Sequence, residues 1–147
     1  MTIIPFTLLN LQGDGYHIII DVEIFDTPFK MVLDTGASKT VLDKTTVMAS
    51  GLAEHDLQST NILSTGLGTN SMESFTLHLP KIKIQDWQTK KIDVAVLDLS
   101  AINYAYGQME LPLVIGVLGG DILTRYGAVI DYNKCTIKLR SRPVRRN

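Results

Sequence analysis

The residues with the clearest capacity for chemistry are Asp34, Thr35 and Gly36, which directly follow the apolar residues 31–33. An apolar run of this kind is typical of the end of a buried strand, and Gly36 permits a sharp turn after it. Residues 40–42 then resume an apolar run. We therefore expect the Asp34 carboxyl group at the end of a strand, facing a cleft, where it can serve as a general acid or base.

The Asp-Thr-Gly tripeptide occurs once in the 147 residues. The nearest variant, Asp26-Thr27-Pro28, ends in proline, which lacks the backbone N–H and the torsional freedom of glycine. Asp121 is a weaker candidate for a second acid, because its place at the start of a short predicted helix favours a helix-capping role. The chain thus supplies one acid in this setting.

Other reactive residue types lack the spacing of a site. The three histidines and the cysteine show no metal-ligand spacing, so we predict no bound metal and no cofactor. The Gly66-x-Gly68 pair has Ser71 where a phosphate-binding fingerprint needs its third glycine. Nothing around Ser38 resembles a nucleophile elbow. Asp34 remains the strongest candidate for a catalytic residue.

Alternating apolar and polar residues predict that strands dominate the fold. Residues 17–31 are predicted to form a β-hairpin with a turn at Asp26-Thr27-Pro28. Further strands are predicted over residues 75–79, 82–84 and 92–96, a buried apolar run over 113–118, and a last hairpin over 128–139. Short helices are predicted over residues 42–50, 100–109 and 121–126, with Ser100 as the cap of the second. The expected fold is therefore mainly β with two or three short helices.

The composition changes between residues 59 and 74, where Ser, Thr, Gly and Asn are concentrated. The centre of this segment is residues 64–70. Such a composition predicts a mobile hairpin tip, and an ordinary exposed turn is the open alternative.

Length and composition favour one domain. The chain has 45% hydrophobic residues and is long enough to bury a sizeable core, so we assign residues 1–140 to a single domain. Four arginines crowd the last eight residues: Arg140, Arg142, Arg145 and Arg146. Pro143 and the absence of apolar spacing predict a basic, disordered tail over residues 141–147, and a binding patch is the weaker alternative.

Charge and hydropathy argue against two classes of partner. A net charge of -1 offers nucleic acid no general attraction. No apolar run approaches the ~18 residues of a membrane span, and no positively charged leader precedes the apolar amino terminus. The single cysteine, Cys135, cannot form an intramolecular disulfide, which fits a reducing compartment. We expect a soluble, cytoplasmic protein without nucleic-acid or membrane partners.

The combination of Asp34-Thr35-Gly36 with a later apolar-apolar-glycine segment, Val117-Leu118-Gly119, resembles the retropepsin-like aspartic proteases, which are single-domain and pepsin-type. The resemblance covers roughly residues 16–140. It implies a closed, partly barrel-like β fold. In that fold Leu118 and Gly119, which belong to the segment similar to the family's ψ-loop, pack beneath the Asp34 loop.

The chemistry of these proteases requires two acids. Peptide hydrolysis without a metal or a nucleophile needs one group to deprotonate water and another to protonate the substrate carbonyl. Two carboxyl groups about 3 Å apart cannot both stay ionised, so they share a proton and supply both functions, as is established for this class of protease. Because the chain carries one Asp-Thr-Gly, we predict a homodimer with one Asp34 from each subunit at the two-fold axis.

The resemblance also implies roles for the residues around Asp34. Thr35 would hydrogen-bond across the two-fold axis, and the Gly36 N–H would support the carboxylate. Ala37 and Ser38 would line the first substrate subsites. A flap would close over an extended peptide that is bound through main-chain hydrogen bonds. The flap residues are Thr65, Gly66, Leu67 and Gly68.

These features predict an aspartic endopeptidase that acts on a peptide or protein substrate. The alternative is a catalytically silent domain of the same fold that binds peptides or scaffolds a partner. That alternative stays open because the flap lacks the tyrosine that pepsin-type enzymes carry near its tip, and because the sequence identifies no dimerisation surface. Ala37 stands where pepsin-type enzymes often have a hydroxyl residue. Its lack of a hydrogen bond favours the protonated dyad, which predicts a weakly acidic optimum.

Overall fold

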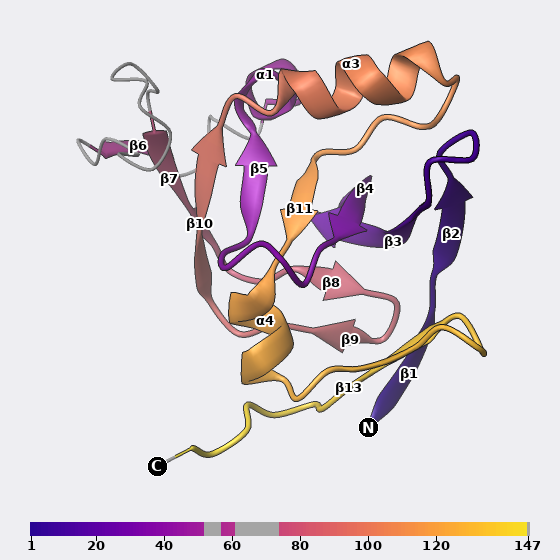
Figure 1. The fold of residues 1–147 in the computed structure, drawn as a ribbon. Coiled ribbons are helices and arrows are strands. Elements are labelled where there is room, and N and C mark those ends of the chain that lie inside the picture. Colours follow the sequence, from indigo (N-terminus) through magenta and orange to yellow (C-terminus); the bar gives the residue numbers. More distant parts are fainter. Residues whose placement is uncertain (52–56, 61–73, 147) are drawn as a thin grey trace.

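Two β-sheets form most of the computed structural model, which describes residues 1–51, 57–60 and 74–146 (Figure 1). The strands of the larger sheet are β2 (Thr7–Asn10), β3 (Tyr16–Ile24), β4 (Thr27–Leu33), β5 (Val41–Asp43), β6 (Leu57–Thr60), β7 (Ser74–Leu79), β8 (Lys83–Ile84), β9 (Trp87–Gln88), β10 (Ile92–Leu97) and β11 (Gly116–Leu118). They follow the order β6-β7-β10-β5-β11-β4-β3-β8-β9, and β2 pairs with β3. The smaller sheet consists of β1 (Thr2–Pro5), β13 (Thr136–Leu139) and β12 (Val129–Asp131), in that order.

Three short helices accompany the sheets in the described part of the chain: α1 (Lys44–Ala49), α3 (Ser100–Gln108) and α4 (Gly120–Arg125). Helix α3 lies along one end of the larger sheet, and α4 follows directly after β11 (Figure 1). Within the described residues, no helix has the length and apolar content needed to span a membrane. The predicted mainly β fold with two or three short helices is confirmed.

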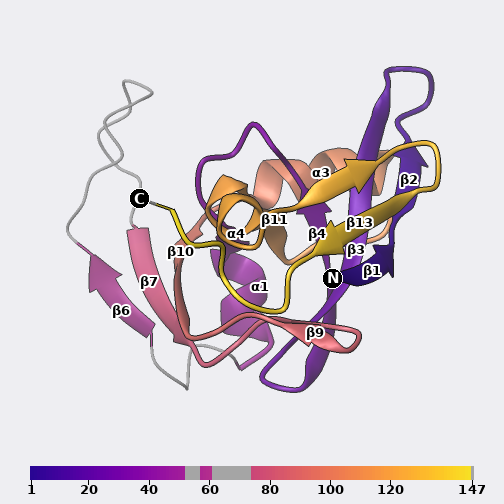
Figure 2. The ribbon, with the colours of Figure 1, turned by 90° about the horizontal axis from the view of Figure 1, so that it is seen from below.

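The larger sheet curls into a half-barrel around the main hydrophobic core (Figures 1 and 2). Leu77 of β7 lies far in the sheet order from Ile24 of β3 and Ile84 of β8, yet all three side chains enter this core and each is at most 1% exposed. Their apolar alternation predicted these strands, and burial of the shared apolar face accounts for the curl. The smaller sheet adds Ile4 and Ile137 to the same core.

The turn of the β3–β4 hairpin lies one residue earlier than the sequence predicted. Ile24 pairs with Thr27, which leaves Phe25 and Asp26 as a two-residue turn with φ of 48° and 61°. Pro28 lies in β4 opposite Glu23. This pair adjoins the hydrogen-bonded pair of the turn, so the proline nitrogen faces away from β3. β11 pairs with β4 only from Met31 onward, and the missing N–H costs no hydrogen bond.

Two helix boundaries also differ from prediction. The helix predicted over residues 42–50 begins only at Lys44, because residues 41–43 pair with β10 and β11. Its N-cap is Asp43, whose Oδ2 accepts the Thr46 N–H at 3.1 Å. Ser100 is the first residue of α3 and not its cap: the Ser100 N–H donates to Asp98 Oδ1 at 2.9 Å. Hydrogen bonds from Ser100 hold the pKa of Asp98 below its ordinary value.

The apolar run predicted as buried over residues 113–118 is buried only from Val114 onward. Leu113 is 71% exposed and follows Pro112, which is also exposed, so the run begins on the surface. The buried part of the run consists of strand β11 and the two residues before it, Val114 and Ile115.

The carboxy-terminal residues 140–146 pass beside α4 (Figure 2). The Val144 N–H donates to the Arg125 carbonyl oxygen at 2.7 Å, and Arg146 Nη2 donates to the Thr124 carbonyl oxygen at 3.1 Å. These two hydrogen bonds join the described part of the predicted tail to α4. The division of the chain into a domain over 1–140 and a tail over 141–147 stays a prediction.

Candidate active site

The loop of residues 34–40 joins β4 to β5 across the end of a third strand. β11 lies between β4 and β5: it runs parallel to β4, with Leu118 opposite Leu33, and antiparallel to β5. Because β4 and β5 are not neighbours, the loop passes over the end of β11, where Leu118 and Gly119 lie (Figure 1). Pairing between strands that are distant in sequence thus brings the two predicted segments of the site together.

Asp34 is exposed and held by backbone groups on both sides. Its N–H donates to the Leu118 carbonyl oxygen at 3.0 Å, and its Oδ1 accepts the Gly36 N–H at 2.8 Å. The Ala37 N–H donates to the Asp34 carbonyl oxygen at 3.2 Å. A Cβ atom at position 36 would lie 3.2 Å from Asp34 Oδ1, so glycine leaves the carboxylate uncrowded. One carboxylate oxygen is therefore fixed by the loop.

Gly119 lets two backbone segments approach closely beneath the loop. A Cβ atom there would lie 2.6 Å from the Lys39 carbonyl oxygen and 2.8 Å from that of Ala37, closer than packed atoms allow. The next two N–H groups, of Gly120 and Asp121, donate to the Ala37 and Ser38 carbonyl oxygens at 2.7 and 3.1 Å. The geometry accounts for glycine at position 119 and fixes the loop from below.

Thr40 is a structural member of the site that the sequence did not single out. Its side chain is fully buried, and its hydroxyl accepts the Gly119 N–H at 3.1 Å and donates to Asp121 Oδ1 at 2.7 Å. A hydroxyl at the start of an apolar run was the available signal, because a buried polar group needs a partner. Thr40 therefore joins both segments of the site through one hydroxyl.

Asp121 is not the helix cap that the sequence predicted. The N-cap of α4 is Gly119, and Asp121 lies inside the first turn. Its Oδ1 accepts the Ile122 N–H at 2.8 Å as well as the Thr40 hydroxyl. This carboxylate supports the loop from within the helix and is not a second copy of Asp34.

A second hydrophobic cluster lies on the opposite face of β4 from the main core. Successive strand residues alternate between faces, so Leu33 enters the main core and Val32 enters the second cluster. In that cluster Val32 meets Ile19, Val117 and Tyr106, each at most 8% exposed. The Asp34 loop thus follows a strand that is packed on both faces, which gives it a rigid base.

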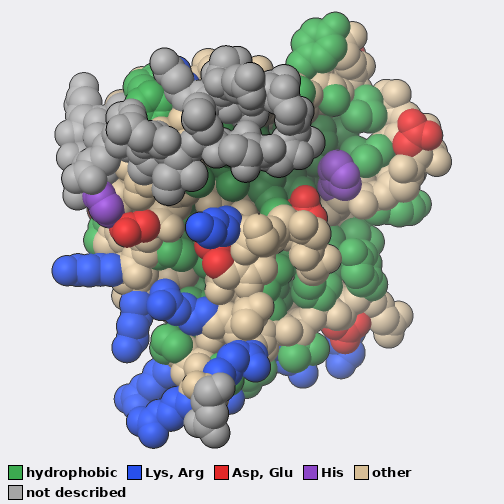
Figure 3. Space-filling model, turned by 60° about the vertical axis from the view of Figure 1, so that its left-hand side comes forward, with side chains coloured by type: hydrophobic (Ala, Val, Ile, Leu, Met, Phe, Trp, Pro, Cys, Tyr) green, Lys and Arg blue, Asp and Glu red, His purple; other side chains and the backbone are tan. Residues whose placement is uncertain are grey.

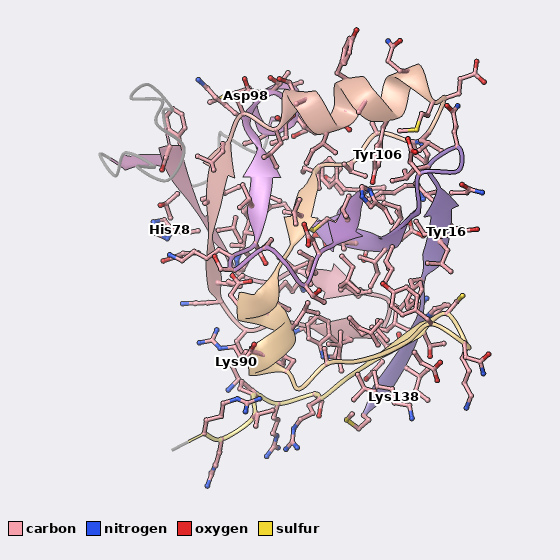
Figure 4. All side chains as sticks on the ribbon, viewed as in Figure 1. Tyr16, His78, Lys90, Asp98, Tyr106 and Lys138 are labelled. Atoms are coloured by element: carbon pink, nitrogen blue, oxygen red, sulfur yellow. The ribbon has the colours of Figure 1, made fainter. Side chains whose placement is uncertain are left out.

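Tyr106 connects α3 to β3 beside this cluster (Figure 4). Its hydroxyl oxygen is 2.6 Å from His17 Nδ1, a hydrogen-bonding distance. Burial raises the pKa of the Tyr106 phenol. Ala37, a residue of the predicted first subsite, packs against the same cluster.

The predicted flap residues Thr65, Gly66, Leu67 and Gly68 lie outside the described residues. The structure brings Asp34, Thr35, Gly36, Ala37 and Ser38 into one loop over Leu118 and Gly119. Among the described residues, no group of three or more His, Cys, Asp or Glu side chains could hold a metal ion. The catalytic and binding roles of the loop stay predictions.

A family model described as Aspartyl protease matches residues 20–122, a range that includes the Asp34 loop, β11 and Gly119. The chain belongs to this family. The match covers both segments that meet at the site, so it agrees with the resemblance found in the sequence. A comparison with curated proteins finds no match.

Two solved structures are similar to this chain. One is a retropepsin-like aspartic protease from Rickettsia conorii, with a TM-score of 0.57 and 26% identity over 92% of this chain and 86% of that chain. The other is the retroviral protease-like domain of Ddi1 from Leishmania major, with a TM-score of 0.59 and 15% identity over 84% of this chain and 87% of that chain. The second likeness concerns the fold alone. The retropepsin-like fold is thereby confirmed.

Proposed function

We propose that this protein is an aspartic endopeptidase whose active site forms in a homodimer, from Asp34 of one subunit and Asp34 of the other. The observation that carries the proposal is the exposed Asp34 carboxylate, held by the Gly36 N–H on a loop that is fixed to Leu118 and Gly119. Membership of the aspartyl protease family supports the reaction class. The single Asp-Thr-Gly supports the symmetry, because the reaction needs two carboxyl groups.

In the proposed reaction the two carboxyl groups share one proton. The ionised carboxylate takes a proton from water, and the resulting hydroxide attacks the carbonyl carbon of the peptide bond. The protonated partner gives its proton to the carbonyl oxygen. The tetrahedral intermediate then collapses: the carboxyl group that took a proton from water gives it to the amine nitrogen as the C–N bond breaks. A hydroxyl group of the intermediate returns a proton to the other carboxylate, which restores the shared proton. The chain's own contribution is position: the Gly36 N–H holds one carboxylate oxygen so that it does not have to reorganise during the reaction.

The first test compares Asp34→Asn with Asp26→Asn on a diverse peptide library between about pH 3 and pH 8, with cuts detected by mass spectrometry. Both changes replace an exposed aspartate that precedes threonine. Asparagine can still accept the Gly36 N–H, and it tolerates the positive φ of position 26. We expect Asp34→Asn to lower cleavage at least about 10³-fold and Asp26→Asn to leave it unchanged. Equal cleavage by the wild type and Asp34→Asn would remove the proposal.

The second test concerns the dimer. Sedimentation gives the mass at the assay concentration, and mixing gives the functional unit. If both subunits supply Asp34, an equal amount of Asp34→Asn exchanged into the wild type should remove about half of the activity, because half of the wild-type chains then have an inactive partner. An equal amount of Asp26→Asn should add its own activity instead. If the Asp34→Asn mixture instead keeps the full wild-type activity, one chain suffices and the dimer proposal fails.

A catalytically silent peptide-binding domain is the second candidate. It is favoured by the same exposed Asp34, since a single chain holds one such carboxylate and therefore half of a dyad. A monomer that binds peptides and cuts none of them would establish this candidate in place of the protease.

A further inference from the structure

An open depression of about 630 Å³ adjoins the active-site loop on the side of α4. Ser38 lines one part of it, and Thr124, Arg125 and Arg146 line the other. The Ser38 carbonyl oxygen also accepts a hydrogen bond from the Asp121 N–H, so the depression begins at a residue that is fixed to the site. A peptide that passes Ser38 can reach this depression with a side chain further along its length.

Two arginines give the depression its positive charge. The carboxy-terminal segment holds Arg146 in place, since the Val144 N–H donates to the Arg125 carbonyl oxygen and Arg146 Nη2 donates to the Thr124 carbonyl oxygen. Among the described residues, neither Arg125 nor Arg146 forms an ion pair. Lysine and arginine side chains gather around this carboxy-terminal segment in Figure 3. The concentration of positive charge is local, because the chain as a whole has a net charge of -1.

One acidic group also lines the depression. Asp121 is part of its wall, and its Oδ1 is engaged by the Thr40 hydroxyl and the Ile122 N–H. These two donors offset part of its negative charge. Each guanidinium group has five N–H donors, more than the one hydrogen bond from Arg146 to Thr124 uses. A guanidinium can bind a carboxylate through two parallel hydrogen bonds.

We propose that Arg125 and Arg146 bind an acidic side chain of the substrate, at a position beyond the residues that flank the cleaved bond. The inference rests on the proposed protease function and names its substrate class: peptides with Asp or Glu at that position. A peptide carboxylate fits better than a nucleic-acid phosphate, because the depression continues from the substrate loop at Ser38 and the net charge offers no wide basic surface.

The experiment uses matched peptides that differ only in Glu or Gln, placed at each position two to five residues from the cut. The quantity measured is the ratio of kcat/KM for the Glu peptide to that for the Gln peptide. We expect a ratio of roughly three to ten at one position on one side of the cut, since both arginines are exposed and screened. The ratio should fall towards one in about 0.5 M salt.

Variants then assign the preference to these residues. Arg125→Gln and Arg146→Gln should each lower the ratio. Arg125→Glu should bring the ratio below one and make a peptide with Lys at that position a better substrate than the Glu peptide. Arg145→Gln is the matched control, because it removes an exposed arginine of the same segment that does not line the depression. Arg125 also lies in the last turn of α4, where a cation stabilises the helix, so thermal unfolding is measured for each variant.

The outcomes separate this inference from the proposed function. If cleavage depends on Asp34 but the Glu and Gln peptides are cut at equal rates, the inference fails and the proposed protease function stands. The same conclusion follows if Arg125→Gln and Arg146→Gln leave the ratio unchanged. If the wild type cuts nothing, the protease proposal fails. Binding of the same labelled peptides to Asp34→Asn, followed by fluorescence anisotropy, then decides the inference: equal affinity for Glu and Gln overturns it. Tighter binding of a phosphate-rich single-stranded DNA than of the Glu peptide also overturns it.

Discussion

An aspartate followed by threonine occurs at two turns of this molecule, and the two turns have different structures. Asp26 is the second residue of the two-residue hairpin turn between β3 and β4, two strands that are direct neighbours in the sheet, and Thr27 is the first residue of β4. Asp34-Thr35 begins a loop between β4 and β5, two strands that β11 separates. The Asp34 loop consequently has backbone partners in Leu118 and Gly119. An aspartate on a turn becomes a candidate active-site residue here because a third strand lies beneath its loop.

The two turns also differ in the residue that follows the threonine. Thr27 is exposed and its hydroxyl donates weakly to the Phe25 carbonyl oxygen at 3.4 Å. In the second turn, glycine follows Thr35 and donates to the Asp34 carboxylate, whereas Pro28 has no N–H to give. A surface turn needs only a permitted backbone conformation. A site also needs hydrogen-bond donors that point at the carboxylate.

The largest expected effect comes from closing the space beneath the Asp34 loop. Gly119→Ala places a methyl group within 2.6 Å of the Lys39 carbonyl oxygen, so the backbone must shift, and we expect the free energy of unfolding to fall by about 2–3 kcal/mol. Urea unfolding measures it. Gly107→Ala in α3, where a Cβ atom meets nothing within 4 Å, is the control and should raise stability by up to about 1 kcal/mol. Equal effects of both changes would contradict the close approach at Gly119.

A somewhat smaller effect is expected from removing the buried hydroxyl. Thr40→Val leaves the Gly119 N–H and Asp121 Oδ1 without their shared partner and should cost about 1–3 kcal/mol of unfolding free energy. Thr27→Val, at the exposed turn, should change stability by less than about 0.5 kcal/mol. Chemical denaturation of both variants measures the difference, and a Thr40→Val protein as stable as the wild type would show that the bridge contributes nothing.

The comparison can also be tested by copying the tripeptide. Pro28→Gly creates a second Asp-Thr-Gly at the hairpin turn and should cost about 0.5–1 kcal/mol, because glycine gains freedom in the unfolded chain. Added to Asp34→Asn, it should restore no peptide cleavage, since β11 pairs with β4 only from Met31 onward and, among the described residues, does not pair with Thr27 or Pro28. Recovery of cleavage in the double variant would show that the tripeptide alone makes the site.

The smallest expected effect is a shift of the pH profile. Ala37→Ser introduces a hydroxyl into the Asp34 loop, where it could donate to the ionised form of the proposed dyad and favour that form at lower pH. The acidic limb of kcat/KM against pH should move to lower pH, with little change in stability. Ala37→Gly, which adds no donor, serves as the control. Identical profiles for the wild type and Ala37→Ser would contradict this, and a wild-type optimum below about pH 3 would contradict the weakly acidic optimum itself.

Local signals predicted much of the fold. Apolar alternation located the strands around Ile24, Leu77 and Ile137, because each strand buries one face in the core. The same signals misplaced element ends. The pairing of Val41 with β10 and β11 overrode the predicted start of α1, and the register at Ile24 and Thr27 moved the hairpin turn.

By itself, the sequence determined that one Asp-Thr-Gly follows an apolar strand and that glycine at position 36 can turn the chain there. It also carried the family resemblance through Val117-Leu118-Gly119. Only the tertiary structure decided that Thr40 joins the two segments and that Arg125 and Arg146 line the same depression as Ser38. The physical reason is that β11 enters the sheet between β4 and β5, and contacts that depend on such a long-range pairing leave no local pattern for the sequence to show.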